Sequence, residues 1–202
     1  MRRLITTTFV TLDGVMQAPG GPEEDPSNGF AYGGWQAPFS DEATGEFIGE
    51  TMSTPFDLLL GRKTYDIFAG YWPLHVDDPV GAAFQKATKY VASRSRLDLE
   101  WEGSRLIEGD VNEYLRRLKQ DGGPDLHVWG SGDLIQTLLG GDVIDEMRLL
   151  IYPIILGSGK RLFADGGVAR SFTATKTAVA KDGVIMAAYE PAGAVETGTV
   201  GQ

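Results

Sequence analysis

One junction in the sequence limits how this chain can fold. There an apolar run is followed by glycine, two cations and a hydroxyl, at a point where a helix could begin. Residues 58–60 read as a short buried strand, Gly61 lets the backbone turn, and Thr64 follows at a helix start. Arg62 and Lys63 place positive charge at the same turn. Such a junction is typical of α/β sheets in which helix N-termini bind anions. For this motif alone, a plain surface turn is the alternative.

A second strand ends in groups that suit phosphate. Residues 89–92 read as a strand followed by Ser93 and Arg94. Guanidinium groups bind phosphate with paired hydrogen bonds. A cofactor with a free 2′-hydroxyl is usually met by a carboxylate, so Ser93 and Arg94 favour a 2′-phosphorylated one.

A third strand runs through two glycines into a helical pattern. Residues 126–129 are apolar apart from one histidine, and Gly130, Ser131 and Gly132 follow them. Backbone amides at this turn could hold a pyrophosphate. The turn is not the dinucleotide fingerprint, because the third glycine would fall at Ile135.

Strands and helices alternate along the chain, which favours an α/β sheet with parallel pairs. Ser40 is the expected cap of a helix over its first-turn acids. Lys181-Asp182-Gly183 marks a C-terminal hairpin. The expected strands are 4–10, 56–60, 89–92, 126–129, 147–156, 171–180 and 184–190, and the expected helices are 41–52, 64–70, 80–87, 111–119 and 133–139.

The long segment after the first strand is expected to be functional or loosely ordered. It combines the turn residues 19–22 with a polar, acidic stretch and ends in Phe30, Tyr32 and Trp35. Aromatic side chains are unusual in a plain linker. We expect Trp35 to lie over the reacting end of a bound ligand, where its face could stack on a flat substrate.

Composition excludes several classes of protein. The chain has 202 residues, 42% of them hydrophobic, which fits a single domain at 1–191 followed by a small polar tail at 192–202 that we expect to be disordered. With 18 basic and 28 acidic residues the net charge is -10, so neither a nucleic acid nor a membrane is an expected partner. No cysteine is present, which excludes disulfides and thiolate chemistry and agrees with a cytoplasmic location.

Metal and phosphate-loop sites are not expected. His75 and His127 lie on unrelated segments without a carboxylate at ligand spacing. The segment Gly157-Ser158-Gly159-Lys160 fails the phosphate-loop pattern, because the first glycine would fall at Ile154. We interpret it as a turn after a strand.

The order of these motifs resembles the dihydrofolate-reductase-like family, and within it the stand-alone relatives of the RibD C-terminal reductase domain of riboflavin biosynthesis. The resemblance runs from about residue 4 to residue 191. The motifs that carry it are Thr11-Leu12-Asp13-Gly14, Leu60-Gly61-Arg62-Lys63-Thr64-Tyr65, Tyr71-Trp72-Pro73, Val91-Ala92-Ser93-Arg94, Gly130-Ser131-Gly132, Asp145-Glu146 and the run from Pro153 to Phe163.

The resemblance implies a three-layer αβα fold with a mostly parallel sheet and NADPH bound across the strand ends. The positions that match cofactor contacts are Gly61, Arg62, Thr64, Ser93, Arg94, Gly130, Ser131, Gly132, Asp133 and Leu134. The turn at residues 157–163 lines the pocket between cofactor and substrate in the family, which implies that Gly157, Gly159 and Phe163 lie near the substrate.

Two carboxylates are candidate catalytic acids. In dihydrofolate reductases an acid follows a Trp-x-x-Pro segment, and Asp41 follows a similar segment that starts at Trp35 but is one residue longer. A first-turn position in a helix is the alternative for Asp41. Asp13 is the second candidate, and its alternative is a turn-forming Asp-Gly pair.

The expected function is hydride transfer from NADPH to a small electron-poor C=O or C=N substrate, pterin-like or pyrimidine-like. The alternative is a protein that binds NADP(H) on the same fold without turnover, as a sensor or assembly subunit. A deaminase half is excluded, since the chain has no cysteine and no His-x-Glu motif. We expect a small-molecule substrate and a homodimer, in which the apolar strand at 147–155 and the terminal hairpin contribute to the two-fold contact.

Overall fold

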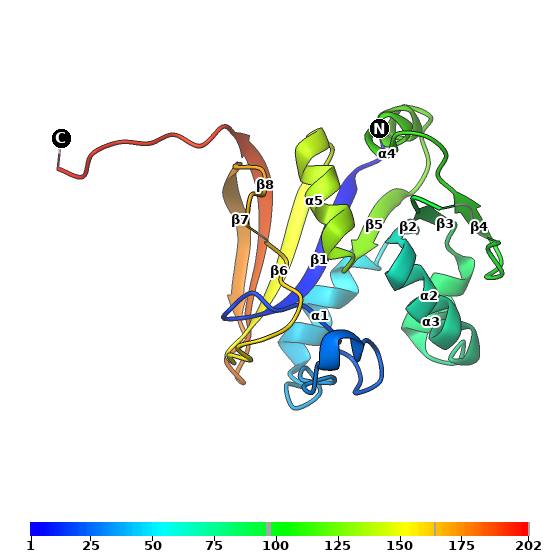
Figure 1. Cartoon of the computed structure of the whole chain (residues 1–202), viewed down its shortest axis with the longest axis horizontal. Helices are drawn as coiled ribbons and strands as arrows, with labels where there is room; N and C mark the ends of the chain where they lie inside the picture. The colour runs from blue at the N-terminus through cyan, green and yellow to red at the C-terminus, as the bar shows by residue number, and fades with distance from the viewer. Residues whose placement is uncertain (96–97, 164, 202) are drawn as a thin grey trace.

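One sheet organises the chain. The computed structural model describes residues 1–95, 98–163 and 165–201 and places eight strands in the order β4-β3-β2-β5-β1-β6-β8-β7 (Figure 1). The strands are β1 (Leu4–Thr11), β2 (Phe56–Gly61), β3 (Lys89–Ala92), β4 (Ser104–Leu106), β5 (Asp125–Trp129), β6 (Glu146–Tyr152), β7 (Ser171–Val179) and β8 (Ile185–Gly193). The helices are α1 (Glu42–Thr51), α2 (Arg62–Tyr71), α3 (Pro79–Lys86), α4 (Val111–Gln120) and α5 (Gly132–Gly141), with short 3-10 turns η1 (Ser27–Gly29) and η2 (Trp72–Leu74).

The sheet is parallel except at one side. Strands β1 to β6 pair in parallel, and β8 adds antiparallel to β6 and is followed by β7. Residues 58–60 are fully buried. Because helices cover both faces of a parallel sheet, its inner strands have continuous apolar sequences. The predicted α/β fold with a C-terminal antiparallel hairpin is confirmed.

Helices cover both faces of the sheet, which gives three layers (Figure 1). Alternation along β5 shows how one strand serves both layers: Leu126 and Val128 pack with α4 and α5, whereas Trp129 packs with α2 and α3. Helix α1 and the segment before it cover the same face as α2, over β6 and β8.

Several predicted boundaries were wrong by a few residues. Strand β6 ends at Tyr152, because Pro153 cannot continue the ladder. Helix α2 begins at Arg62 rather than at residue 64. The short strand β4 was not predicted, since its three residues carry no alternating pattern. Strand β8 continues to Gly193, two residues beyond the predicted end of the domain.

One predicted side-chain role was also wrong. The N-cap of α1 is Asp41 rather than Ser40, and its carboxylate accepts the Ala43 N–H at 2.9 Å. On α4, Lys119 anchors the helix to the segment after α5, because its Nζ donates to the Val143 carbonyl at 3.1 Å and pairs with Asp145 at 2.5 Å.

The edges of the sheet bear on assembly. Strand β6, expected at a two-fold contact, lies inside the sheet between β1 and β8, and β7 forms the edge on that side. The last residues extend away from the body of the molecule (Figure 1). Within the part of the chain that the structure describes, no helix has the length and apolar character needed to cross a bilayer.

Candidate functional site

The strand order creates a topological switch point at the carboxyl edge of the sheet. Strands β2 and β5 are parallel neighbours, yet the helix that follows β2 packs on one face and the helix that follows β5 packs on the other. The two chain segments therefore diverge as they leave the sheet. In open α/β sheets such a switch point is where ligands bind.

A hydrogen-bonded junction joins the two segments at the switch point. The Gly61 N–H donates to the Ser131 Oγ at 3.0 Å, and that hydroxyl donates to the Thr64 Oγ1 at 2.6 Å. A side chain at residue 61 would bring its Cβ within 3.1 Å of the Ser131 Oγ, so glycine is what allows this approach. Gly130 and Ser131 both adopt positive φ, 66° and 65°, which turns the chain sharply into α5.

The two helices that start at the junction have no side-chain caps. Neither Gly61 before α2 nor Ser131 before α5 caps the first-turn N–H groups through its side chain. Aspartate caps α1, α3 and α4, at positions 41, 78 and 110. The ends of α2 and α5 thus keep donors and partial positive charge for an anion. We call residues 61–64 and 130–134 the cradle.

Charged groups stand beside the cradle. The Arg62 Nε donates to both carboxylate oxygens of Asp66, at 2.9 and 2.6 Å, in a pair exposed to solvent. The Ser93 Oγ accepts the Ser95 N–H at 3.2 Å, and Arg94 is exposed just past the end of β3. Because these side chains are exposed, a phosphate could displace the Arg62–Asp66 pair at small cost.

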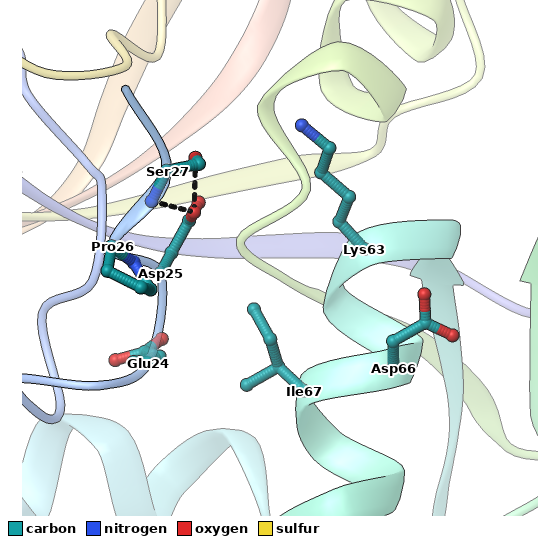
Figure 2. A pocket seen from close by; sticks show the side chains of 7 residues that line it. All are labelled: Glu24, Asp25, Pro26, Ser27, Lys63, Asp66 and Ile67. Carbon is teal, nitrogen blue, oxygen red and sulfur yellow. Dashed lines mark hydrogen bonds between the residues drawn. The ribbon is translucent and has the colours of Figure 1, made fainter. Parts of the chain in front are cut away.

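An open groove of about 380 Å³ lies between the loop before η1 and helix α2 (Figure 2). The Lys63 side chain extends from the first turn of α2 along the groove, while Asp66 points away from the loop. Lys63 is the cradle residue among those that line the groove, so the groove borders the start of α2. Its lining residues are Glu24, Asp25, Pro26, Ser27, Lys63, Asp66 and Ile67.

Glu24 is the acid on the loop side whose charge is disfavoured. Its Oε2 accepts the N–H groups of Gly20 and Gly21, at 2.7 and 3.2 Å. Burial outweighs these hydrogen bonds and raises the pKa of Glu24 above its usual value. Asp25 differs: burial acts to raise its pKa, but hydrogen bonds and charge from Lys160, together with Ser27, bring the pKa below the usual value.

Asp13 is engaged by its own turn. Its carboxylate accepts the Thr11 hydroxyl at 2.6 Å and the N–H groups of Leu156 and Gly157, at 3.3 and 2.9 Å. The Thr11 hydrogen bond, followed by those of the amides, lowers the pKa of Asp13 despite some burial. The carboxylate is thus kept ionised and ties the end of β1 to the turn after β6.

Asp41 is also occupied by backbone donors. Besides capping α1, its carboxylate accepts the Lys181 N–H at 3.3 Å, in the β7–β8 hairpin turn. It is not among the residues that line the groove. The structure thus gives both predicted acids a task in holding segments together, and their part in catalysis stays a prediction.

The predicted substrate-binding residues lie apart from the groove lining. Trp35 is buried, with its indole N–H donating to the Gln17 carbonyl at 2.7 Å and its ring edge-on to Tyr152. Gly157 carries the amide that binds Asp13, and Phe163 is exposed. Substrate contact by Trp35, Gly157, Gly159 or Phe163 stays a prediction.

Sequence reasoning missed the groove because its loop wall carries no motif. The acidic stretch before η1 was expected to be functional or loosely ordered, and nothing in its sequence shows which side chains turn inward. Lys63 was noted only for its charge.

His127 has a structural environment. It stacks on Phe56, and burial lowers its pKa to about 4.

Comparison with known proteins places this geometry in a family. The model of the RibD C-terminal domain matches residues 2–186. An uncharacterized protein of Bacillus subtilis (strain 168), YyaP, is 28% identical over 196 residues, which cover 93% of this chain and 94% of that protein.

Solved structures share the fold. A protein from Shewanella sp. PV-4 assigned to riboflavin biosynthesis has a TM-score of 0.68 at 23% identity, with 94% of this chain and 98% of that chain covered. Dihydrofolate reductase from Enterococcus faecalis, complexed with NADP(H), has a TM-score of 0.59 at 16% identity, with 94% and 96% covered.

Proposed function

The chain belongs to the RibD C-terminal domain family, and on that basis we propose that it is an NADPH-dependent reductase of a small electron-poor C=O or C=N compound. One observation carries the proposal. Two helices without side-chain caps, α2 and α5, start side by side at the switch point of the sheet. A pyrophosphate bound there would accept hydrogen bonds from the first-turn N–H groups of both helices.

The cradle has the shape and donors that such a cofactor needs. Gly61, Gly130 and Gly132 let the backbone come close to a ligand, and the first-turn amides through Asp133 and Leu134 supply donors. The hydrogen bond between the Ser131 and Thr64 hydroxyls holds the starts of α2 and α5 next to each other. Arg62, with Ser93 and Arg94 beside it, would bind the 2′-phosphate.

The cofactor supplies the hydride, and the protein positions the reactants and excludes water. In this proposal the groove beside α2 receives the reducible compound. Ile67 and Pro26 give it apolar surface, and Lys63 and Glu24 give it one cation and one carboxyl of raised pKa. Asp13 and Asp41 stay the predicted proton donors, but neither lines the groove, so each would have to act through ordered water.

The second candidate is a protein that binds NADP(H) without turnover. The engagement of Asp13 and Asp41 by backbone amides favours it, because a proton donor needs a carboxyl free to meet substrate. The two candidates share the cradle and differ only in chemistry.

Cofactor titration and absorbance separate these functions. We expect NADPH to bind and a panel of dihydropterins and small carbonyl compounds to contain one that lowers the nicotinamide absorbance at a rate proportional to protein concentration. Binding without any such loss supports the second candidate, and absence of NADPH binding rejects both.

Assembly and location are further expectations. We propose a homodimer, the commonest soluble oligomer, in the cytoplasm. Light scattering that gives the monomer mass across a wide range of concentrations rejects the dimer.

A further inference from the structure

The loop wall of the groove is held by a lysine from the turn after β6. The Lys160 Nζ donates to the Asp25 carboxylate and, at 2.7 Å, to the Ser27 Oγ. Asp25 and Ser27 both line the groove. The Asp25 Oδ1 also accepts the Ser27 N–H at 3.3 Å and the Ser27 hydroxyl, as the dashed lines in Figure 2 show.

A buried glutamine reinforces the same attachment. The Gln17 Nε2 donates to the carbonyls of Asp25 and Ser27, at 2.9 and 3.0 Å, and its Oε1 accepts the Lys160 N–H at 3.0 Å. Gln17 is only 4% exposed, so these bonds are shielded from water. The Gln17 side chain thus bonds both to the loop wall and to the turn. The backbone carbonyl of Gln17 accepts the Trp35 indole N–H.

The glycine before the lysine allows this arrangement. Gly159 has a φ of 124°, and a Cβ at that position would lie 2.6 Å from the Val15 Cγ1 and 2.8 Å from the Phe30 ring. Only glycine fits so close a contact in that conformation. The Gly-Ser-Gly-Lys segment, which fails as a phosphate loop, is thereby explained as a turn that delivers Lys160 to the loop wall.

The ion pair is partly shielded from solvent. The side chains of Lys160 and Asp25 are 33% and 20% exposed. Such a pair, joined by hydrogen bonds to a hydroxyl, contributes more than an exposed one. The other two lining acids are placed differently, since Asp66 pairs with Arg62 and Glu24 bonds to backbone amides.

We propose that Lys160 is a positioning residue, which through Asp25 and Ser27 holds the loop wall of the groove in place before any ligand binds. A wall that is already ordered does not have to be ordered on binding, so affinity is gained without a new contact. What the groove receives rests on the proposed function. The attachment itself does not, and the two are tested separately.

Hydrogen exchange in the absence of ligand tests the attachment. Lys160→Met keeps the aliphatic stem and removes the charge, and we expect amides in residues 19–30 to exchange about five- to tenfold faster. Lys160→Arg should restore most of the protection. Lys176→Met is the matched control, because it removes an ion pair to Glu50 on α1, away from the groove.

A double variant tests the route. If Lys160 acts through Asp25, adding Asp25→Asn to Lys160→Met should raise exchange no further. Equal exchange in wild type and Lys160→Met, or an equal rise in Lys176→Met, overturns the proposal.

Steady-state kinetics test the consequence for binding. With the dihydropterin or carbonyl compound that the wild type reduces fastest, Lys160→Met should raise KM severalfold with kcat within about twofold, and Lys160→Arg should reverse the change. An unchanged KM with faster loop exchange overturns the positioning role. A wild type that binds no NADPH rejects the proposed function, and the exchange result still decides the attachment.

Discussion

Helices α1, α3 and α4 begin differently from α2 and α5. Each of the first three is capped by an aspartate, Asp41, Asp78 or Asp110, whose carboxylate accepts first-turn N–H groups. The other two follow Gly61 and Ser131 and have no such cap. In the three capped helices the chain itself satisfies first-turn donors, whereas at α2 and α5 these donors are left to solvent or a ligand.

The difference teaches where to look for a ligand. An uncapped start in isolation has little meaning, but α2 and α5 leave neighbouring strands toward opposite faces and are joined by the Gly61–Ser131 and Ser131–Thr64 hydrogen bonds. Two sets of donors meet at one point. The carboxylates Asp13 and Asp41, by contrast, already accept hydrogen bonds from amides of their own chain.

A carboxylate placed at an uncapped helix start should make that start resemble the capped ones and weaken cofactor binding. Ser131→Asp would put negative charge beside the start of α5, and aspartate tolerates the left-handed conformation found there. We expect NADPH affinity to fall on the order of 100-fold, through charge repulsion and loss of the hydroxyl bridge to Thr64. Isothermal calorimetry measures it. Ser131→Ala separates the two causes, since it removes the hydroxyl without adding charge.

Removing the cations should change cofactor choice. Arg62→Gln or Arg94→Gln should each weaken NADPH binding by about 1.5 to 3 kcal/mol and leave NADH binding nearly unchanged, because only NADPH carries the 2′-phosphate. Arg117→Gln, on the exposed face of α4, is the control. Equal affinity of the wild type for NADPH and NADH would reject the assignment.

Removing a cap should affect stability alone. Asp78→Ala and Asp110→Ala should each lower the free energy of unfolding by about 1 kcal/mol, because first-turn N–H groups lose their acceptor. NADPH affinity should stay within about twofold. Urea unfolding together with cofactor titration measures both, and a large loss of NADPH affinity would mean that capped and uncapped helices are not independent.

The smallest effect is expected at Asp41. Asparagine is also a good N-cap, so Asp41→Asn should change the free energy of unfolding by less than about 0.5 kcal/mol. Its bonds to Ala43 and Lys181 predict an unchanged pH dependence of kcat. A shifted pH–rate profile would instead support Asp41 as a proton donor, which would place a catalytic group at the N-terminus of a capped helix.

Sequence patterns predicted the sheet well and the contacts of single side chains poorly. Apolar runs such as residues 58–60 identify buried strands because burial on both faces requires them. The Gly61 turn and the start of α5 were found because glycines mark both turns, and Gly130 has a positive φ of 66°, a conformation that glycine adopts readily. The short β4 strand has too few residues to show a period.

The groove could not be predicted, because it depends on contacts between segments far apart in the chain. Lys160 meets Asp25 and Ser27 only after the sheet has formed, and Gln17 is buried by the same event. Trp35 was expected at the ligand because it is aromatic and follows a polar loop. Its indole is buried against Tyr152, a contact that no local pattern reports.

The position of β1 has a consequence for synthesis of the chain. This strand lies inside the sheet, and its two neighbours, β5 and β6, both come much later in the chain. A nascent chain therefore cannot bury Leu4–Thr11 until Tyr152 has left the ribosome. Folding must wait for distant partners, which slows it and leaves the first strand open to aggregation or chaperone capture. Deleting Leu4–Thr11 should abolish folding, because β5 and β6 would lose the strand between them.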